Sequence, residues 1–310
     1  MSSSSTNFLL SAANVSWGRR ERNCVTAIAD VGGALDGLYF NIDAPASVGG
    51  ASSPFYVWVN VDAGGNDPTP VGRVGIPVAI STGDSAIAVA LAIQTALEAQ
   101  NLFRAKISPD NSATVIVDSE FIGLVTDPAT DVDSGFTFEQ AVPGIGGDLG
   151  KTNGGIEVSI ESGKASITAD QSGGSEGLVL DQVLLGQKVS VSMTLIEMTQ
   201  ARWKAVVGGV TGDTYTPSGG NELVGFGESR LYDSLFDLGG ELVLHPTRKA
   251  ANDKLFDITL FKAAPLPASL NFSPDEVQGM EISFDALADR DVQAAINLMA
   301  FGDSSQDVRA

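Results

Sequence analysis

Residues 173–177, Gly-Gly-Ser-Glu-Gly, have the G-x-S-x-G spacing that can hold a nucleophilic serine at a sharp turn. His245 is the only histidine of the chain, and it follows Ser175 in the order that a serine–histidine hydrolase requires. Such a turn must lie between a buried strand and a helix. Here the preceding residues are half polar, and LVLDQVLLG after the motif is typical of a strand or loop. The pattern favours a Gly-rich turn, and it favours a surface or hydrogen-bonded structural role for His245.

Metal and cofactor chemistry has little support in the sequence. One histidine and one cysteine, Cys24, cannot supply the paired ligands of a zinc site. Asp131 and Asp133 begin like a calcium loop, but Gly135 occupies the third acidic position and the distal glutamate is missing. The run GIGGDLG lacks the spacing of a dinucleotide-binding loop. We therefore expect no catalytic residues, no metal and no cofactor.

The charge of the chain argues against a grip on nucleic acid. The 38 acidic and 18 basic residues give a net charge of -20, whereas phosphate contacts need clusters of lysine and arginine. The one basic cluster of the first half is Arg19, Arg20 and Arg22, which indicates either a solvated loop or salt bridges to an acidic neighbouring chain. No signal peptide or membrane-length apolar run is apparent, so we expect a soluble protein made in the cytoplasm.

The elements of residues 148–203 alternate strictly between apolar and polar positions. Ile156, Val158 and Ile160 are separated by polar residues, and the same period of two recurs over 189–195. This pattern predicts strands that bury one face and expose the other. We expect three strands joined by Gly-rich turns, with a hairpin over 156–170 and a short helix from Glu197 to Val207, stopped by Gly208 and Gly209. The polar face is rich in carboxylates, and Lys164 is the one nearby base.

A separate small module is predicted over 35–143. FYVWVNV at 55–61 is typical of a strand, and a helix running to about Asn101 can be capped by Asp84. Its apolar side is predicted to hold Ile87, Val89, Leu91, Ile93 and Leu97. Two further strands are expected at 113–117 and 136–139, which makes this an α+β module. The junction VPGIGGDLG contains one proline and four glycines and is the best boundary in the chain.

The remaining strands are expected at 241–245, 255–261 and 280–284. The predicted fold is therefore mainly β: an antiparallel β-sandwich or barrel with one short helix, plus a small inserted α+β domain. Three parts follow: an N-terminal segment 1–34, the inserted domain 35–143, and a β-sandwich core 144–310.

One stretch of the chain reads DLGKTNGGIEVSIESGKASITADQSG and is followed by a valine- and leucine-rich strand, LIEMT and a short helix. In this stretch the chain resembles the major tail tube proteins of long-tailed bacteriophages. FDLGGELVLHPT, LFDITLFKAAP and MEISFDALAD resemble the closing strands of that family. The resemblance covers 144–310 and part of 1–34. The middle segment is similar to a small domain of some phage structural proteins and would lie outside the tube.

The resemblance implies a virion protein that assembles as hexameric rings, which stack into a tube through which DNA is ejected without specific binding. Its partners would be copies of itself and other tail proteins, such as the tail tip, the terminator and a sheath. Residues 1–34 would join the tube core or contacts between rings. The polar positions of the strands would face the acidic lumen: Glu157, Ser159, Glu161, Thr168, Asp170, Ser190, Ser192, Thr194, Glu281, Ser283 and Asp285.

Two alternatives of other classes remain open. A Ser175/His245 hydrolase is the first. The second is a carbohydrate-binding or host-surface-binding β-sandwich, which would need exposed aromatic side chains on one loop face, where the sequence offers little beyond Trp203 and Tyr215.

Overall fold

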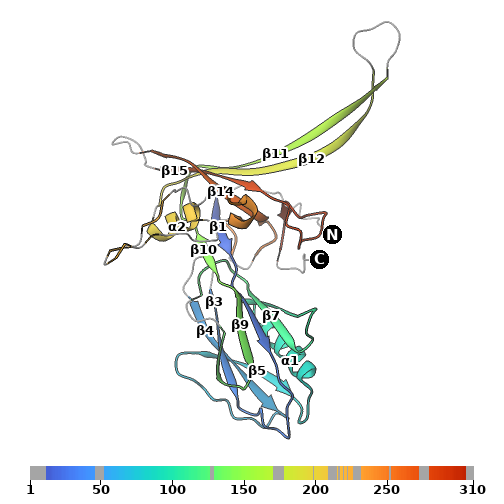
Figure 1. Cartoon of the computed structure of the whole chain (residues 1–310), viewed down its shortest axis with the longest axis vertical. Coiled ribbons are helices and arrows are strands. Elements are labelled where there is room, and N and C mark those ends of the chain that lie inside the picture. Colours follow the sequence, from blue (N-terminus) through green and yellow to red (C-terminus); the bar gives the residue numbers. More distant parts are fainter. Residues whose placement is uncertain are drawn as a thin grey trace, which may run out of the picture.

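The computed structural model of the chain describes residues 12–45, 52–125, 129–197, 199–208, 215, 217–218, 220–221, 223–225, 232–250, 253–271 and 279–304, with 170–177 excepted. Figure 1 shows three parts: a small module, a core sheet, and a long two-stranded ribbon that projects from the core. The protein is mainly β, as the sequence predicts, with few and short helices.

The core is built on one eight-stranded sheet, in the order β10-β1-β13-β14-β15-β12-β11, with β16 pairing beside β14. All of these pairs are antiparallel. The strands are β1 (Ala13–Arg19), β10 (Ile145–Asp148), β11 (Thr152–Ala169), β12 (Leu178–Leu195), β13 (Gly240–Pro246), β14 (Ile258–Asn271), β15 (Gly279–Ala286) and β16 (Ala300–Phe301). Two helices accompany them, α2 (Gln200–Gly208) and α3 (Leu235–Leu238).

Strand β14 folds this sheet into a sandwich. Its first half pairs with β13 and its second half pairs with β15, so one strand belongs to both halves of the sheet. The two halves bury a shared core. In this core the ring centroids of Trp17 of β1 and Phe284 of β15 are 6.0 Å apart. The indole Nε1 of Trp17 donates a hydrogen bond to the carbonyl of Ala263, at 2.9 Å. Helix α2 adds Ala205 and Val206 to the same core.

The small module consists of two four-stranded sheets. One has the order β6-β7-β2-β9 and the other β5-β4-β3-β8, where β4 and β5 are parallel. The strands are β2 (Arg22–Thr26), β3 (Tyr39–Pro45), β4 (Ser52–Val61), β5 (Val74–Ile80), β6 (Phe103–Ile107), β7 (Thr114–Ser119), β8 (Thr130–Asp133) and β9 (Thr137–Val142). Helix α1 (Ala86–Glu98) connects β5 to β6 and packs Val89, Ile93 and Leu97 into the core between the sheets.

The N-terminal strands divide between two bodies, the core and the small module. Strand β1 lies in the core sheet, whereas β2 pairs with β7 and β9 of the small module. The chain leaves the core sheet after Arg19 and returns through β10. At the return, Gly18 and Gly146 face each other across β1 and β10, and a Cβ on Gly146 would lie 2.1 Å from the carbonyl oxygen of Trp17. Gly146 has a φ of 85°, which also favours glycine.

The long hairpin differs from its prediction. Strand β11 runs unbroken from Thr152 to Ala169, so Gly163 lies within a strand rather than in a turn over 156–170. Its partner β12 is equally long, and the connection between them, which contains Asp170 and Ser175, lies outside the described residues. The register shifts at Gly163, where Leu185 of β12 is the extra residue of a β-bulge. Alternation alone could not distinguish a turn from a bulge.

Smaller differences concern the helix boundaries. The N-cap of α1 is Ser85, not Asp84, and its side chain accepts a hydrogen bond from the Ala88 amide. Ile87 and Leu91 are more than half exposed, against the prediction that they share the buried side. Helix α2 begins at Gln200 and includes Gly208, and β14 begins at Ile258 and continues ten residues beyond the predicted end at Phe261, to Asn271.

Candidate functional site

The polar positions predicted from the sequence fall into rows across three neighbouring strands. Glu157 of β11 pairs with Ser192 of β12, which pairs with Ser283 of β15. The next row joins Ser159, Ser190 and Asp285, and a third joins Asn153, Thr194 and Glu281. Because paired residues share a face of a sheet, these side chains form one surface on the side away from the core. The structure therefore brings together nine of the eleven candidates, all except Thr168, whose side chain is not described, and Asp170.

This polar face keeps an excess of carboxylates. Glu161 lies opposite Lys188, and the Nζ of Lys188 is 3.8 Å from Asp285. The side chain of Lys188 is 61% exposed, so the pair contributes little to stability. Lys164 lies on the opposite face, because it is an odd number of positions from Glu161 along the same strand. The prediction that Lys164 is the base of this face is therefore wrong, and Lys188 lies there instead, which only the cross-strand register reveals.

The outer part of the hairpin forms a ribbon without neighbours among the described residues. From Ile160 to Lys164 and from Asp181 to Lys188 every residue is exposed. The run Val183-Leu184-Leu185 belongs to this stretch, with Leu184 56% and Leu185 69% exposed. Strand β11 is also the edge of the core sheet. An isolated two-stranded hairpin is marginally stable in water, and a free edge can pair with another chain.

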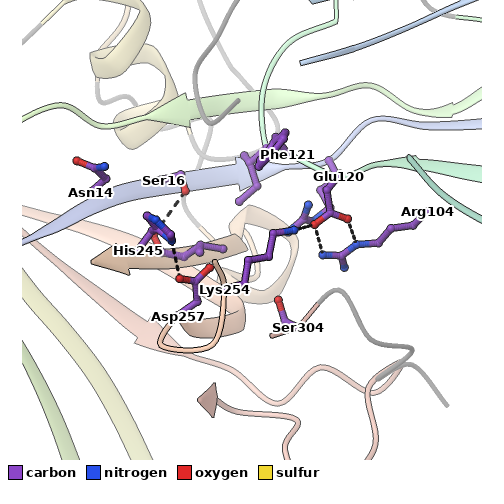
Figure 2. A pocket seen from close by; sticks show the side chains of 12 residues that line it. Asn14, Ser16, Arg104, Glu120, Phe121, His245, Lys254, Asp257 and Ser304 are labelled. Carbon is purple, nitrogen blue, oxygen red and sulfur yellow. Dashed lines mark hydrogen bonds and ion pairs between the residues drawn. The ribbon is translucent and has the colours of Figure 1, made fainter. Parts of the chain in front are cut away.

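A second candidate site is a cavity of about 210 Å³ between the small module and the core. Figure 2 shows His245 of β13 directed toward Asp257, with Nδ1 2.6 Å from Oδ1. Both side chains are buried, and Nε2 of His245 lies 3.4 Å from the Lys249 carbonyl. Burial raises the pKa of Asp257, and His245 opposes that shift through its hydrogen bond and its charge. His245 is therefore a buried, hydrogen-bonded residue, in agreement with the structural interpretation rather than the surface one.

Glu120 lies at the other end of this cavity and receives cations from both bodies. Arg104 of β6 binds it through two nitrogens, with Nε 2.5 Å from Oε2 and Nη2 3.1 Å from Oε1. Lys254 of the core, between β13 and β14, contacts the same Oε1. Figure 2 shows the two cations converging on this carboxylate. Burial, followed by repulsion from Arg104 and Arg20, lowers the pKa of Lys254 to about 8.

The predicted arginine cluster belongs to the same region. Arg20 makes a bidentate ion pair with Glu241 of β13, at 2.7 Å for both contacts. Burial alone would lower the pKa of Arg20, but attraction and hydrogen bonding to Glu241 raise it above its usual value. Arg22 pairs with Asp118, at 2.6 Å. Both side chains thus find acidic partners within the chain, so neither is a solvated loop residue.

This cavity does not assemble a serine nucleophile. Ser16 lines it beside His245, but its hydroxyl donates to the Val243 carbonyl at 3.5 Å. In the part of the chain that the structure describes, no serine hydroxyl is hydrogen-bonded to His245. Ser175, the nucleophile of the G-x-S-x-G pattern, lies outside that part.

Two aromatic residues and two aspartates remain among the sequence candidates, and both aromatic residues, Trp203 and Tyr215, are hydrogen-bonded to the segment 223–224. Trp203 of α2 packs against the core and donates its Nε1 hydrogen to the Val224 carbonyl at 3.1 Å, while Tyr215 is 67% exposed. Asp131 and Asp133, which begin like a calcium loop in the sequence, belong to strand β8. Over the described ranges, no group of three or more histidine, cysteine or acidic residues could hold a metal ion.

Comparison with known proteins adds no relative. No protein-family model matches the chain, and no curated protein matches it. Within the described residues, none of the helices has the length and apolar character needed to cross a membrane.

Proposed function

We propose that this protein is a structural subunit of a phage tail tube, which assembles with copies of itself into stacked rings and has no catalytic role. The observation that carries the proposal is the projecting ribbon of β11 and β12. It combines a free sheet edge with an exposed apolar run, Val183-Leu184-Leu185. The family resemblance of 144–310 supports the same conclusion, and the hexameric state rests on that resemblance alone.

The ribbon is more easily explained in an assembly than in a monomer. Burying one leucine side chain contributes about 1.5–3 kcal/mol, which a monomer forgoes at both Leu184 and Leu185. The outer backbone groups of β11, which pair with no other strand among the described residues, could be satisfied by a strand of a neighbouring copy. Joining sheets edge to edge around a ring would bury the leucines and pair the edge of β11 at the same time, since a closed ring leaves no free edge.

The polar face supports a conduit for DNA. Glu157, Glu161, Glu281 and Asp285 are offset by Lys188 alone among the aligned rows. A surface with this excess of carboxylates repels phosphate groups and offers few donors to hold them. In the assembled tube we place this face toward the lumen, so that DNA passes without being bound. The small module would lie on the exterior, since it extends from the other end of the core (Figure 1).

Electron microscopy of the purified protein tests the assembly. We expect wild-type protein to form rings or tubes at high concentration or beside a tail-tip nucleator. A Leu184→Ser/Leu185→Ser variant should remain folded but assemble poorly, because its ribbon loses apolar contacts. The matched control is Gln182→Ser/Gln187→Ser, which changes two exposed polar residues of the same strand. Persistent monomers of the wild type, or normal tubes of the leucine variant, would overturn the proposal.

A further inference from the structure

We propose that the small module is locked onto the core sheet by a charge joint centred on Glu120, so that the two bodies hold one fixed orientation. The joint is defined as Arg20, Arg104, Glu120, Glu241 and Lys254. It is independent of the tail tube assignment, because it concerns contacts within a single chain.

Glu120 is the residue through which the joint acts. It follows β7 of the small module, is only 5% exposed, and is held by Arg104 of the same module. Lys254, which contacts it from the core, comes from the connection between β13 and β14. One carboxylate is therefore shared by a cation of each body. A guanidinium that binds both oxygens fixes the plane of the carboxylate, which leaves Oε1 directed toward Lys254.

Arg20 supplies the second half of the joint at the point where the chain crosses from core to module. Its guanidinium pairs with Glu241 of the core, and its Nη1 also donates to the Ser119 carbonyl at the end of β7, at 3.4 Å. The side chain of Arg20 thus connects the crossing segment to both the core sheet and the module. The return crossing at Gly144 has no room for a side chain, because a Cβ there would lie 2.2 Å from the Gly123 carbonyl oxygen.

The chemistry of these contacts suits orientation better than stability. A buried ion pair often contributes no more to folding than a well-packed apolar pair, since desolvation offsets most of the attraction. Its angular demands are stricter, because each bidentate contact fixes a geometry as well as a distance. Apolar packing between the bodies would tolerate small rotations, whereas rotation here would leave buried charges without partners.

Pulsed electron paramagnetic resonance on the full chain tests the joint. Spin labels would replace the exposed residues Asp110 of the module and Arg248 of the core, in a Cys24→Ser background. We expect one narrow distance distribution for the parent protein and a distribution about twofold broader for Glu120→Gln, which keeps the shape of the side chain but loses its charge. The matched control is Asp43→Asn, which breaks a buried ion pair with Arg73 that lies entirely within the module.

The outcomes separate the joint from a general loss of stability. Broadening in Glu120→Gln but not in Asp43→Asn supports the joint. Equal narrow distributions in both variants overturn it, as does equal broadening in both. If Glu120→Gln fails to fold, Lys254→Met removes only the core cation and replaces it with an apolar chain of similar length. A distribution that stays narrow in folded Lys254→Met would then overturn the proposal.

Discussion

The usual placement of side chains, with apolar groups inside and charged groups outside, is reversed at two places. Charged groups are buried at the junction between the small module and the core, and apolar groups are exposed on the projecting ribbon. At the junction, charged residues such as Arg20, Glu241 and Glu120 are buried and have partners within the chain. On the ribbon, Leu184 and Leu185 are more than half exposed. Buried charge is tolerated when it is paired, whereas exposed apolar surface marks a contact still to be made. The junction is therefore complete in one chain, whereas our proposal has a second chain complete the ribbon.

The largest effect should come from leaving a junction charge without its partner. Glu241→Ala removes both oxygens that bind Arg20, whose guanidinium would remain buried. We expect a loss of about 3–5 kcal/mol in the free energy of unfolding, measured by urea denaturation. Lys249→Ala, which breaks the more exposed pair with Asp253, is the control and should cost less than about 1 kcal/mol. Similar losses in the two variants would contradict a special role for the junction.

The next effect concerns pH and Lys254. Its pKa in the folded protein is about 8, below the ordinary 10.5, so the unfolded chain binds more protons between these values. Unfolding free energy should therefore rise with pH from about 8 to 10.5, by at most about 3 kcal/mol from this one group. In Lys254→Met this rise should be missing, which parallel denaturation series would show. An identical rise in the variant would assign it to other groups. The charged groups that influence Lys254 are Arg20, Arg104, Glu120, Asp257 and Asp303, and His245 lines the same cavity.

On the ribbon, the same kind of measurement should show almost nothing in the monomer. Leu184→Ser/Leu185→Ser removes side chains that contact solvent, so the unfolding free energy below the assembly concentration should change by less than about 0.5 kcal/mol. Sedimentation at rising concentration should show the difference, because the proposal has the parent assemble and the variant remain monomeric. A large destabilisation of the monomer would mean that the leucines have partners within their own chain.

The smallest effect on folding is expected on the polar face. Glu157→Lys/Glu161→Lys changes two exposed side chains, so the unfolding free energy should shift by less than about 0.5 kcal/mol. If the face lines a DNA conduit, phage particles that carry this variant should eject DNA more slowly, since lysines would hold passing phosphates. Normal ejection, or failure of the variant to fold, would contradict the placement of this face in the lumen.

Elements whose signal is local were predictable from the sequence alone. The period of two over 156–160 and 189–195 depends only on which residues avoid water, and it correctly predicts strands in both segments. The predicted buried face is confirmed over 189–195, whereas Ile160 is exposed. The helix of 86–98 was likewise predictable, because its apolar spacing and a polar residue just before its start are encoded within a few turns. The Gly-rich junction at 142–150 could be predicted from the sequence, because glycine is needed where backbones approach closely, as at Gly146.

Tertiary structure decided everything that depends on residues distant in the chain. Whether Gly163 forms a turn or a bulge depends on its partner strand, and whether Lys188 or Lys164 lies beside the carboxylates depends on register. Glu120 and Lys254 are 134 positions apart, and Arg20 and Glu241 are 221 apart, so no local pattern could pair them. A charged residue has the same sequence signal whether it is solvated or buried. Only folding determines the charge that such a residue meets, and it places Arg20 of the arginine cluster beside Glu241.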